Sequence, residues 1–265
     1  MIGFIGAGNM GSALLSGIIE EKKFRADELA VYDIMDKKAD LLKTTFKINK
    51  VDSIQNLVEN CSTIILATKP KEIKPLLSDI KDYLRDDHLL ISIAAGITIK
   101  LILDILQKDI PVIRVMPNTP AKIRKGITAI ASSEKARAGD IEKAVNIFSQ
   151  VGETVIVKES MMDAVTALSG SGPGYTFYIL ESLVNAGVKA GLTREIAHNL
   201  AIQTVLGSAQ LAKDSNASLA DLREEVTSPG GTTAEGLRVM KEKGLPGIIS
   251  EAVEAACNRS KALSC

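Results

Sequence analysis

Short apolar runs alternate with amphipathic stretches along the first 157 residues of the chain. The apolar runs predict strands at residues 2–5, 29–33, 63–67, 89–93, 112–116, 127–131 and 154–157. Helical periodicity between them predicts helices that include residues 12–21, 75–83 and 133–150. Because two parallel strands need a long connection, this alternation predicts parallel strands joined by helical crossovers.

Helical periodicity alone continues after residue 157. It predicts helices at residues 173–190, 195–213, 219–226, 233–243 and 248–263. Pro173 fits the first turn of a helix, where its missing N–H is not needed, and Ser218 fits an N-cap. The pattern therefore predicts an α/β domain at residues 1–157 and an all-α domain at residues 158–265.

The predicted helices of the second half carry Ala, Leu, Ile and Val on more than one face. Five such helices cannot easily bury that much apolar surface among themselves. Burial in a homo-oligomer would cover it, and packing against the first domain is the alternative.

The composition excludes several classes of protein. Hydrophobic residues make up 46% and charged residues 24% of 265 residues, which is typical of a soluble globular protein. Lys+Arg and Asp+Glu both number 32 and aromatics reach only 3%, so we expect no nucleic-acid or membrane partner. No apolar run approaches the ~18–20 residues of a membrane span, and no leader precedes the first strand, which favours a cytoplasmic location.

The cysteines and histidines do not form a recognisable site. Cys61, Cys257 and Cys265 are odd in number and lack a CxxC spacing, which indicates a reducing compartment. His88 and His198 are far apart in the sequence. We therefore expect no metal centre.

A GxGxxG motif directly follows the first predicted strand and opens the first helix. It comprises Gly6, Ala7, Gly8, Asn9, Met10 and Gly11. In this context Gly6 permits the tight turn, Gly8 lets a pyrophosphate approach the backbone, and Gly11 lets the helix pack closely on the strand. The motif predicts that the first domain is a Rossmann dinucleotide-binding domain.

Asp33 ends the second predicted strand, where a carboxylate typically accepts hydrogen bonds from the adenosine ribose. Such a charge repels a 2′-phosphate, so we expect NADH to work at least as well as NADPH. Lys37 and Lys38 follow closely and could neutralise a phosphate, or they could simply be a solvated helix face. Asp33 could also be an ordinary turn residue.

Further loops follow predicted strands, at the sheet edge where α/β proteins bind ligands. They are Ala67-Thr68-Lys69-Pro70, Ala94-Ala95-Gly96 and Pro117-Asn118-Thr119-Pro120. In the helical half, Ser228-Pro229-Gly230-Gly231 precedes a predicted helix and would expose free N–H groups suited to a carboxylate. The hydroxyls of Thr232 and Thr233 could donate to a substrate atom or cap that helix, and the sequence leaves both readings open.

The chain resembles pyrroline-5-carboxylate reductases along nearly its whole length. The resemblance is carried by GFIGAGNMG, LATKP, SIAAGI, MPNTP, DAVTALSGSGPGY and VTSPGGTTAEGL, in this order. It implies a Rossmann domain followed by a helical dimerisation and substrate domain, in a homodimer or homodecamer. It also implies an oxidoreductase that reduces 1-pyrroline-5-carboxylate to L-proline with NAD(P)H, the last step of proline biosynthesis.

The resemblance also implies roles for individual residues. Gly6 to Gly11 would bind the pyrophosphate. The ribose and nicotinamide would be lined by Ala67, Thr68, Lys69, Pro70 and Ala95, with Asn118 and Glu159 near the nicotinamide. The substrate carboxylate would be held, largely by backbone N–H groups, by Ser228, Gly230, Gly231 and Thr232. Thr233 would be the catalytic residue, hydrogen-bonded to the ring nitrogen.

Two rival functions are weaker. A hydroxyacid dehydrogenase of similar architecture calls for a Lys in the first helix of the second domain, yet none lies between Met161 and Asn185, and Lys189 is far along. A nucleotide-sensing scaffold without turnover would have no need to retain the complete Ser-Pro-Gly-Gly-Thr-Thr segment.

Overall fold

A computed structural model describes residues 1–21 and 23–263. The chain forms two compact units, one of Met1–Ser171 together with the described residues after Ala255, the other of Gly172–Ala255. The boundary predicted after residue 157 follows the last strand, whereas the compact units divide at Ser171. The predicted boundary between functional domains, 1–157 and 158–265, stays a prediction.

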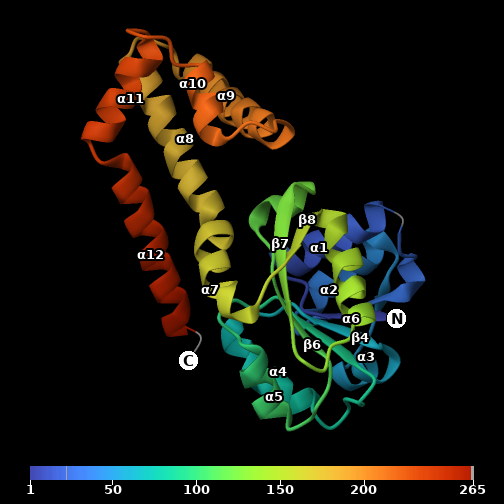
Figure 1. The fold of residues 1–265 in the computed structure, drawn as a ribbon. Helices are drawn as coiled ribbons and strands as arrows, with labels where there is room; N and C mark the ends of the chain where they lie inside the picture. The colour runs from blue at the N-terminus through green and yellow to red at the C-terminus, as the bar shows by residue number, and fades with distance from the viewer. Residues whose placement is uncertain (22, 264–265) are drawn as a thin grey trace. The chain divides into compact units, whose positions relative to one another are not determined.

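The first unit is built on an eight-stranded sheet with the order β3-β2-β1-β4-β5-β6-β7-β8 (Figure 1). The strands are β1 (Ile2–Ile5), β2 (Leu29–Tyr32), β3 (Asn49–Lys50), β4 (Thr63–Leu66), β5 (Leu89–Ser92), β6 (Val112–Met116), β7 (Gly126–Ser132) and β8 (Gly152–Ile156). Every predicted strand is present, and β3 is added to them. The strands from β3 to β6 are parallel, as the alternation predicts.

One pairing differs from the predicted parallel arrangement: β7 runs antiparallel to β6. The connection between them contains a single 3₁₀ turn, η2 (Thr119–Ile123), and no helix that could carry the chain back across the sheet. Helix α6 (Ala138–Phe148) then makes the long crossover that sets β8 parallel to β7.

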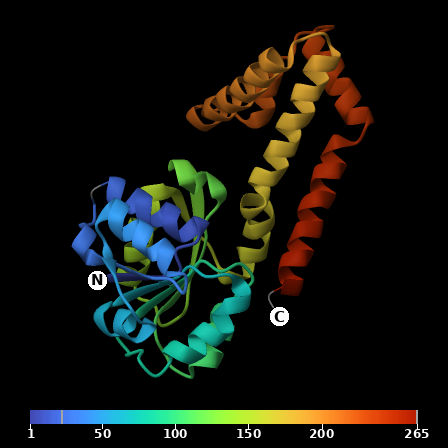
Figure 2. The same cartoon turned by 180° about the vertical axis from the view of Figure 1, so that it is seen from behind.

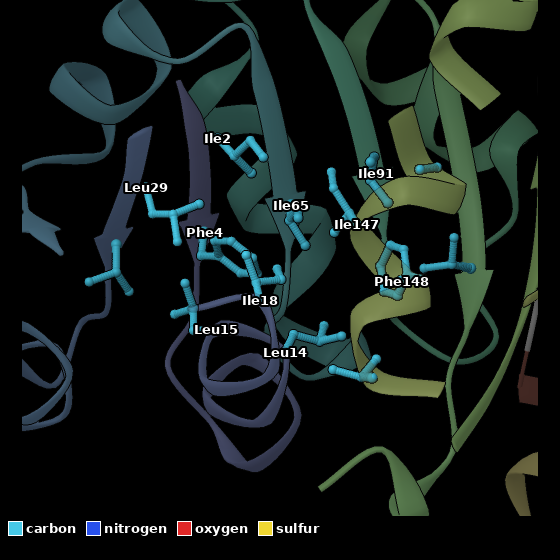
Figure 3. Close-up of a cluster of buried hydrophobic side chains, with 14 of the residues drawn as sticks. Ile2, Phe4, Leu14, Leu15, Ile18, Leu29, Ile65, Ile91, Ile147 and Phe148 are labelled. Carbon is cyan, nitrogen blue, oxygen red and sulfur yellow. The ribbon is translucent and has the colours of Figure 1, made fainter. Parts of the chain in front are cut away.

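Helices cover both faces of this sheet because side chains along each strand alternate between the faces. One face packs against α1 (Asn9–Glu20), α2 (Asp36–Phe46) and α6. The other face packs against α3 (Ile54–Asn60), α4 (Pro70–Ile80) and α5 (Ile99–Leu106). Figure 3 shows the first core, where Leu14, Leu15 and Ile18 of α1 meet Phe4 and Ile65 of the sheet.

A short connecting region follows β8. It contains the 3₁₀ turn η4 (Glu159–Met161), helix α7 (Met162–Val165) and a π-helical turn, η5 (Thr166–Gly170). The last described turns of the chain belong to the same compact unit, and there Ser260 donates a hydrogen bond to Asp163 at 2.7 Å.

The second unit is helical, as predicted (Figure 2). Its helices are α8 (Gly172–Lys189), α9 (Arg194–Asp214), α10 (Leu219–Glu225), α11 (Thr232–Glu242) and most of α12 (Leu245–Leu263). Pro173 lies in the first turn of α8, and Ser218 caps α10 by accepting a hydrogen bond from the Asp221 N–H at 3.2 Å. Both local predictions are confirmed.

The helical unit buries few of its own apolar side chains. Helices α8 and α9 pack through Val184, Ala197 and Ala201, while Tyr178 stays 71% and Leu206 59% exposed. The unit therefore presents far more apolar surface than its own packing covers. Within the described part of the chain, no helix is both long and apolar enough to cross a membrane.

Candidate active site

The strand order reverses direction between β1 and β4, which is where open α/β sheets bind ligands. The loops after these strands touch. Gly6 has a φ of 109°, and a Cβ atom there would lie 2.6 Å from the carbonyl oxygen of Ala67. Only glycine fits this turn, and its close approach brings together the glycine-rich loop and the loop from Ala67 to Pro70, both of which are predicted to bind the cofactor.

The two other glycines of the motif have different reasons to be glycine. A Cβ on Gly11 would collide with the Gly6 carbonyl oxygen, so this glycine lets α1 start close to the strand. A Cβ on Gly8 would meet no protein atom within 4 Å. The protein's own packing therefore does not require Gly8, whereas a ligand lying against the backbone would.

The N-terminus of α1 is ready to receive an anion beside Gly8. Gly8 is the N-cap, and the first helical hydrogen bond runs from the Ser12 N–H to the Gly8 carbonyl at 2.8 Å. The N–H groups of Asn9, Met10 and Gly11 consequently have no partner inside the helix. The first turn carries no acidic side chain, so a pyrophosphate fits the donors present.

These three N–H groups and Gly8 form what we call the cofactor cradle, and Asp33 lies beside it. One carboxylate oxygen accepts the Ala7 N–H at 2.6 Å, and the other accepts the Met35 N–H at 2.8 Å. These bonds fix the charge next to the glycine-rich turn and leave lone pairs for ribose hydroxyls. Asp33 thus shapes the turn, as the simpler interpretation holds, and its contact with a ribose stays a prediction.

The lysines after β2 are not held in position to bind a 2′-phosphate. Lys37 and Lys38 are exposed in the first turn of α2. Lys50 of β3 is already engaged in two ion pairs, because its ammonium lies 2.9 Å from the Asp36 carboxylate and 2.9 Å from the Asp40 carboxylate.

The loop after β4 leads into α4 with Lys69 as the N-cap and Pro70 in the first turn. The Lys69 N–H donates to Glu72 at 3.2 Å, which satisfies one N–H of this helix start. The Thr68 hydroxyl oxygen is buried without a hydrogen-bond partner. A buried polar atom of this kind is unusual and lies in a loop predicted to contact the cofactor.

Glu159 reaches from η4 to the loop that follows β5. Its Oε1 accepts the Ile99 N–H at the start of α5 at 2.7 Å and lies 3.3 Å from the guanidinium of Arg114. Ala95, in the same loop, is exposed. The structure therefore brings Glu159 and the Ala95 loop together, and it adds Arg114, which the sequence analysis missed. The available signal was a charged residue inside the otherwise apolar strand Val112–Met116.

Asn118 links two segments with its side-chain amide. The oxygen accepts the Ile127 N–H at 3.0 Å, and the nitrogen donates to the Ser169 hydroxyl at 3.3 Å. The amide therefore ties the start of β7 to the π-helical turn η5. Direct contact of Asn118 with a nicotinamide stays a prediction.

The Ser-Pro-Gly-Gly segment forms the start of α11 in the helical unit. Gly230 has a φ of 71°, and Gly231 is the N-cap. A glycine offers no capping side chain, so the first N–H groups of the helix stay open to an anion. Thr232 and Thr233 lie inside the first turn, and neither hydroxyl caps the helix. The capping interpretation of these threonines is therefore wrong.

Metal-ligating residues do not gather anywhere in the described chain, where no three His, Cys, Asp or Glu side chains could hold an ion. Cys61 is buried and Cys257 partly so, while Cys265 lies outside the described residues.

Two family models match the chain. Residues 159–263 match a family described as pyrroline-5-carboxylate reductase dimerisation. Residues 1–96 match one described as NADP oxidoreductase, coenzyme F420-dependent. The first match accounts for the exposed apolar side chains of the helical unit as surface buried in a homo-oligomer, and the second supports a nicotinamide cofactor.

Individual relatives match over the full length. A pyrroline-5-carboxylate reductase from Synechocystis sp. is 40% identical over 265 residues, covering 99% of this chain and 97% of the relative. The solved structure of a pyrroline-5-carboxylate reductase from Coxiella burnetii superposes with a TM-score of 0.95 at 36% identity, covering 100% of this chain and 98% of that one. A Plasmodium falciparum pyrroline carboxylate reductase with NADP bound gives a TM-score of 0.89 at 36% identity, with the same coverage.

The fold and the sequence both agree with these relatives over the full length of the chain. The chain therefore belongs to the pyrroline-5-carboxylate reductase family.

Proposed function

We propose that this protein reduces 1-pyrroline-5-carboxylate to L-proline with NAD(P)H in the cytoplasm, as the last step of proline biosynthesis. The observation that carries the proposal is Gly8, a glycine whose side-chain space is empty of protein atoms beside three unpaired N–H groups. Together with the anion-ready start of α11, it supplies one site for a dinucleotide and one for a carboxylate substrate.

The first unit binds the cofactor in this proposal. The N–H groups of Asn9, Met10 and Gly11 hold the pyrophosphate, and Asp33 holds the adenosine ribose. The loop from Ala67 to Pro70 and Ala95 line the ribose and nicotinamide, with Asn118 and Glu159 nearby. When bound, the reduced nicotinamide supplies a hydride to the imine carbon.

The start of α11 binds the substrate. Free backbone N–H groups in the segment from Ser228 to Thr232 hold the carboxylate, and the positive end of the helix favours its charge. The Gly231 N–H contributes less, because it already donates to the Ser228 carbonyl at 3.0 Å. The Thr233 hydroxyl hydrogen-bonds the ring nitrogen and orients it. As the carbon receives the hydride, the C=N double bond becomes single and the nitrogen keeps or gains one proton. That proton comes with a protonated substrate or through water, because a threonine hydroxyl is not acidic near neutral pH.

Cofactor choice depends on Asp33 in this proposal. A fixed carboxylate at the ribose accepts hydrogen bonds from the ribose hydroxyls and repels a 2′-phosphate, so NADH should serve at least as well as NADPH. The two backbone N–H groups that hold the Asp33 carboxylate support this, because they keep the charge at one place. The pairing of Lys50 with Asp36 and Asp40 removes one nearby cation as a phosphate partner.

The assembly is at least a homodimer, formed mainly by residues after Gly172, and a homodecamer is a further expectation. The experiment that tests the function is oxidation of NADH and of NADPH by the purified protein, with and without the imine. Imine-dependent oxidation that yields L-proline is the expected result, and its absence with both cofactors would overturn the proposal.

A further inference from the structure

A buried guanidinium lies in the middle of β6. Arg114 has a side chain only 6% exposed, on the same face of the strand as Val112 and Met116. Val112 belongs to one hydrophobic cluster and Met116 packs against another, so Arg114 lies where the two clusters meet. A charge buried between apolar groups destabilises the fold unless an opposite charge pairs with it.

The partner of Arg114 is Glu159, whose Oε1 lies 3.3 Å from the guanidinium and also accepts the Ile99 N–H at 2.7 Å. Ile99 is the first residue of α5. Two residues further on, the Leu101 N–H is taken by the Thr98 hydroxyl at 3.1 Å. Glu159 therefore adds a second side-chain acceptor to the N-terminus of α5, and its negative charge suits this helix end.

The segment between β5 and α5 is held at both ends, at one end by the sheet and at the other by Glu159. At its start, Ser92 pairs across the sheet with Arg114, and the Ser92 hydroxyl accepts the Ala94 N–H at 3.3 Å. At its end, Glu159 holds Ile99. The exposed residue between these two points is Ala95, the one assigned to the nicotinamide.

We propose that Arg114 is a positioning residue: it holds the Glu159 carboxylate at the start of α5 and thereby fixes the Ala95 loop against the nicotinamide end of the cofactor. The inference rests on the proposed function, which assigns Ala95 to the cofactor and places Glu159 near the nicotinamide. A role limited to fold stability would leave cofactor binding unchanged once the protein is folded.

The test compares Arg114→Met, Glu159→Gln and the double variant in steady-state kinetics and thermal unfolding. Misplacing a loop next to a reacting group lowers kcat/KM by roughly ten- to hundred-fold. Each single variant should raise the KM for NADH at least tenfold while the KM for the imine changes less than twofold. Because both residues act through one contact, the double variant should be no worse than the worse single one.

Three further variants make the result decisive. Arg114→Lys keeps the charge but not the planar fork, so it should fold and show a smaller rise in the KM for NADH. Asp104→Asn removes an exposed carboxylate from the same helix and should change nothing. Ala95→Val crowds the loop directly and should raise the KM for NADH.

The outcomes distinguish failure of the positioning role of Arg114 from failure of the assignment of Ala95 to the cofactor. If Ala95→Val leaves the KM for NADH unchanged, the assignment of this loop to the cofactor fails. If Ala95→Val raises it but Arg114→Met and Glu159→Gln only lower the melting temperature, Arg114 is structural and the inference is overturned. Additive effects of Arg114→Met and Glu159→Gln on the KM for NADH would also overturn it, because the two residues would then act separately.

Discussion

At the scale of single residues, the positions of the Asp33 carboxylate and the Thr233 hydroxyl depend on the backbone around them. Asp33 is held by the N–H groups of Ala7 and Met35, so its charge stays next to the glycine-rich turn. Thr233 lies in the first turn of α11 and does not cap it, so its hydroxyl is free for a ligand. Spacing from the glycine-rich motif singled out Asp33, and the family resemblance singled out Thr233, but only the structure shows what surrounds each of them.

Asp33→Ser should shift cofactor preference toward NADPH by at least tenfold. A carboxylate a few ångströms from a phosphate costs ~1 kcal/mol even in a water-like dielectric, and losing hydrogen bonds to the ribose of NADH costs about as much. The ratio of kcat/KM for the two cofactors, in wild type and variant, measures the shift. A ratio that does not move, or a wild type that strongly prefers NADPH, would remove Asp33 from cofactor selection.

Thr233→Ala should lower kcat/KM for the imine roughly ten- to thousand-fold, as loss of one catalytic hydrogen bond typically does. Because Thr233 does not cap α11, the melting temperature and the KM for NADH should stay close to wild type. Thr44→Ala, which removes an exposed hydroxyl bonded to the Asp40 carbonyl on α2, is the matched control. Wild-type turnover by Thr233→Ala would leave Thr233 as an ordinary helix residue.

Elements were predicted well where their sequence pattern is long and local, and less well where the decisive contact is distant. The strands from β1 to β8 were expected, except for β3, whose two residues carry too little pattern to detect. The antiparallel pairing of β7 was missed, because alternation of strands and helices does not reveal which connection lacks a helix. Arg114 was missed because its partner, Glu159, lies 45 positions away along the chain.

Substitutions at the glycines before α1 test whether the start of this helix binds the cofactor. Gly8→Ala places a methyl group where no protein atom lies within 4 Å, and Gly8 has an ordinary φ of −71°, so the fold should be unaffected. The same methyl should obstruct the pyrophosphate and raise the KM for NADH at least tenfold. Gly6→Ala is the contrasting variant, because its φ of 109° and the nearby Ala67 carbonyl should cost about 1–3 kcal/mol of stability.

Thermal unfolding and cofactor kinetics separate the two glycines. Gly8→Ala should keep its melting temperature and lose cofactor affinity, whereas Gly6→Ala should unfold earlier. A Gly8→Ala protein with wild-type cofactor kinetics would show that no ligand group approaches the backbone at this turn.

The molecule as a whole should work only as an assembly, because the helical unit leaves large apolar side chains uncovered. Leu206→Glu introduces a charge at a 59%-exposed leucine of α9 and should break the dimer with loss of activity. Leu41→Glu makes the same change at a 66%-exposed leucine of α2 and should leave both unchanged. Light scattering and activity at micromolar concentration check this, and a stable, active wild-type monomer would rule it out.

Turnover with the imine tests the central claim most directly, because it requires both the cofactor cradle and the start of α11 in one assembled protein. The measurement is oxidation of NADH and NADPH by purified wild-type protein, with and without 1-pyrroline-5-carboxylate, together with identification of the product. We predict imine-dependent oxidation that forms L-proline, with NADH at least as effective as NADPH. Cofactor binding without any imine-dependent oxidation would contradict the proposed function.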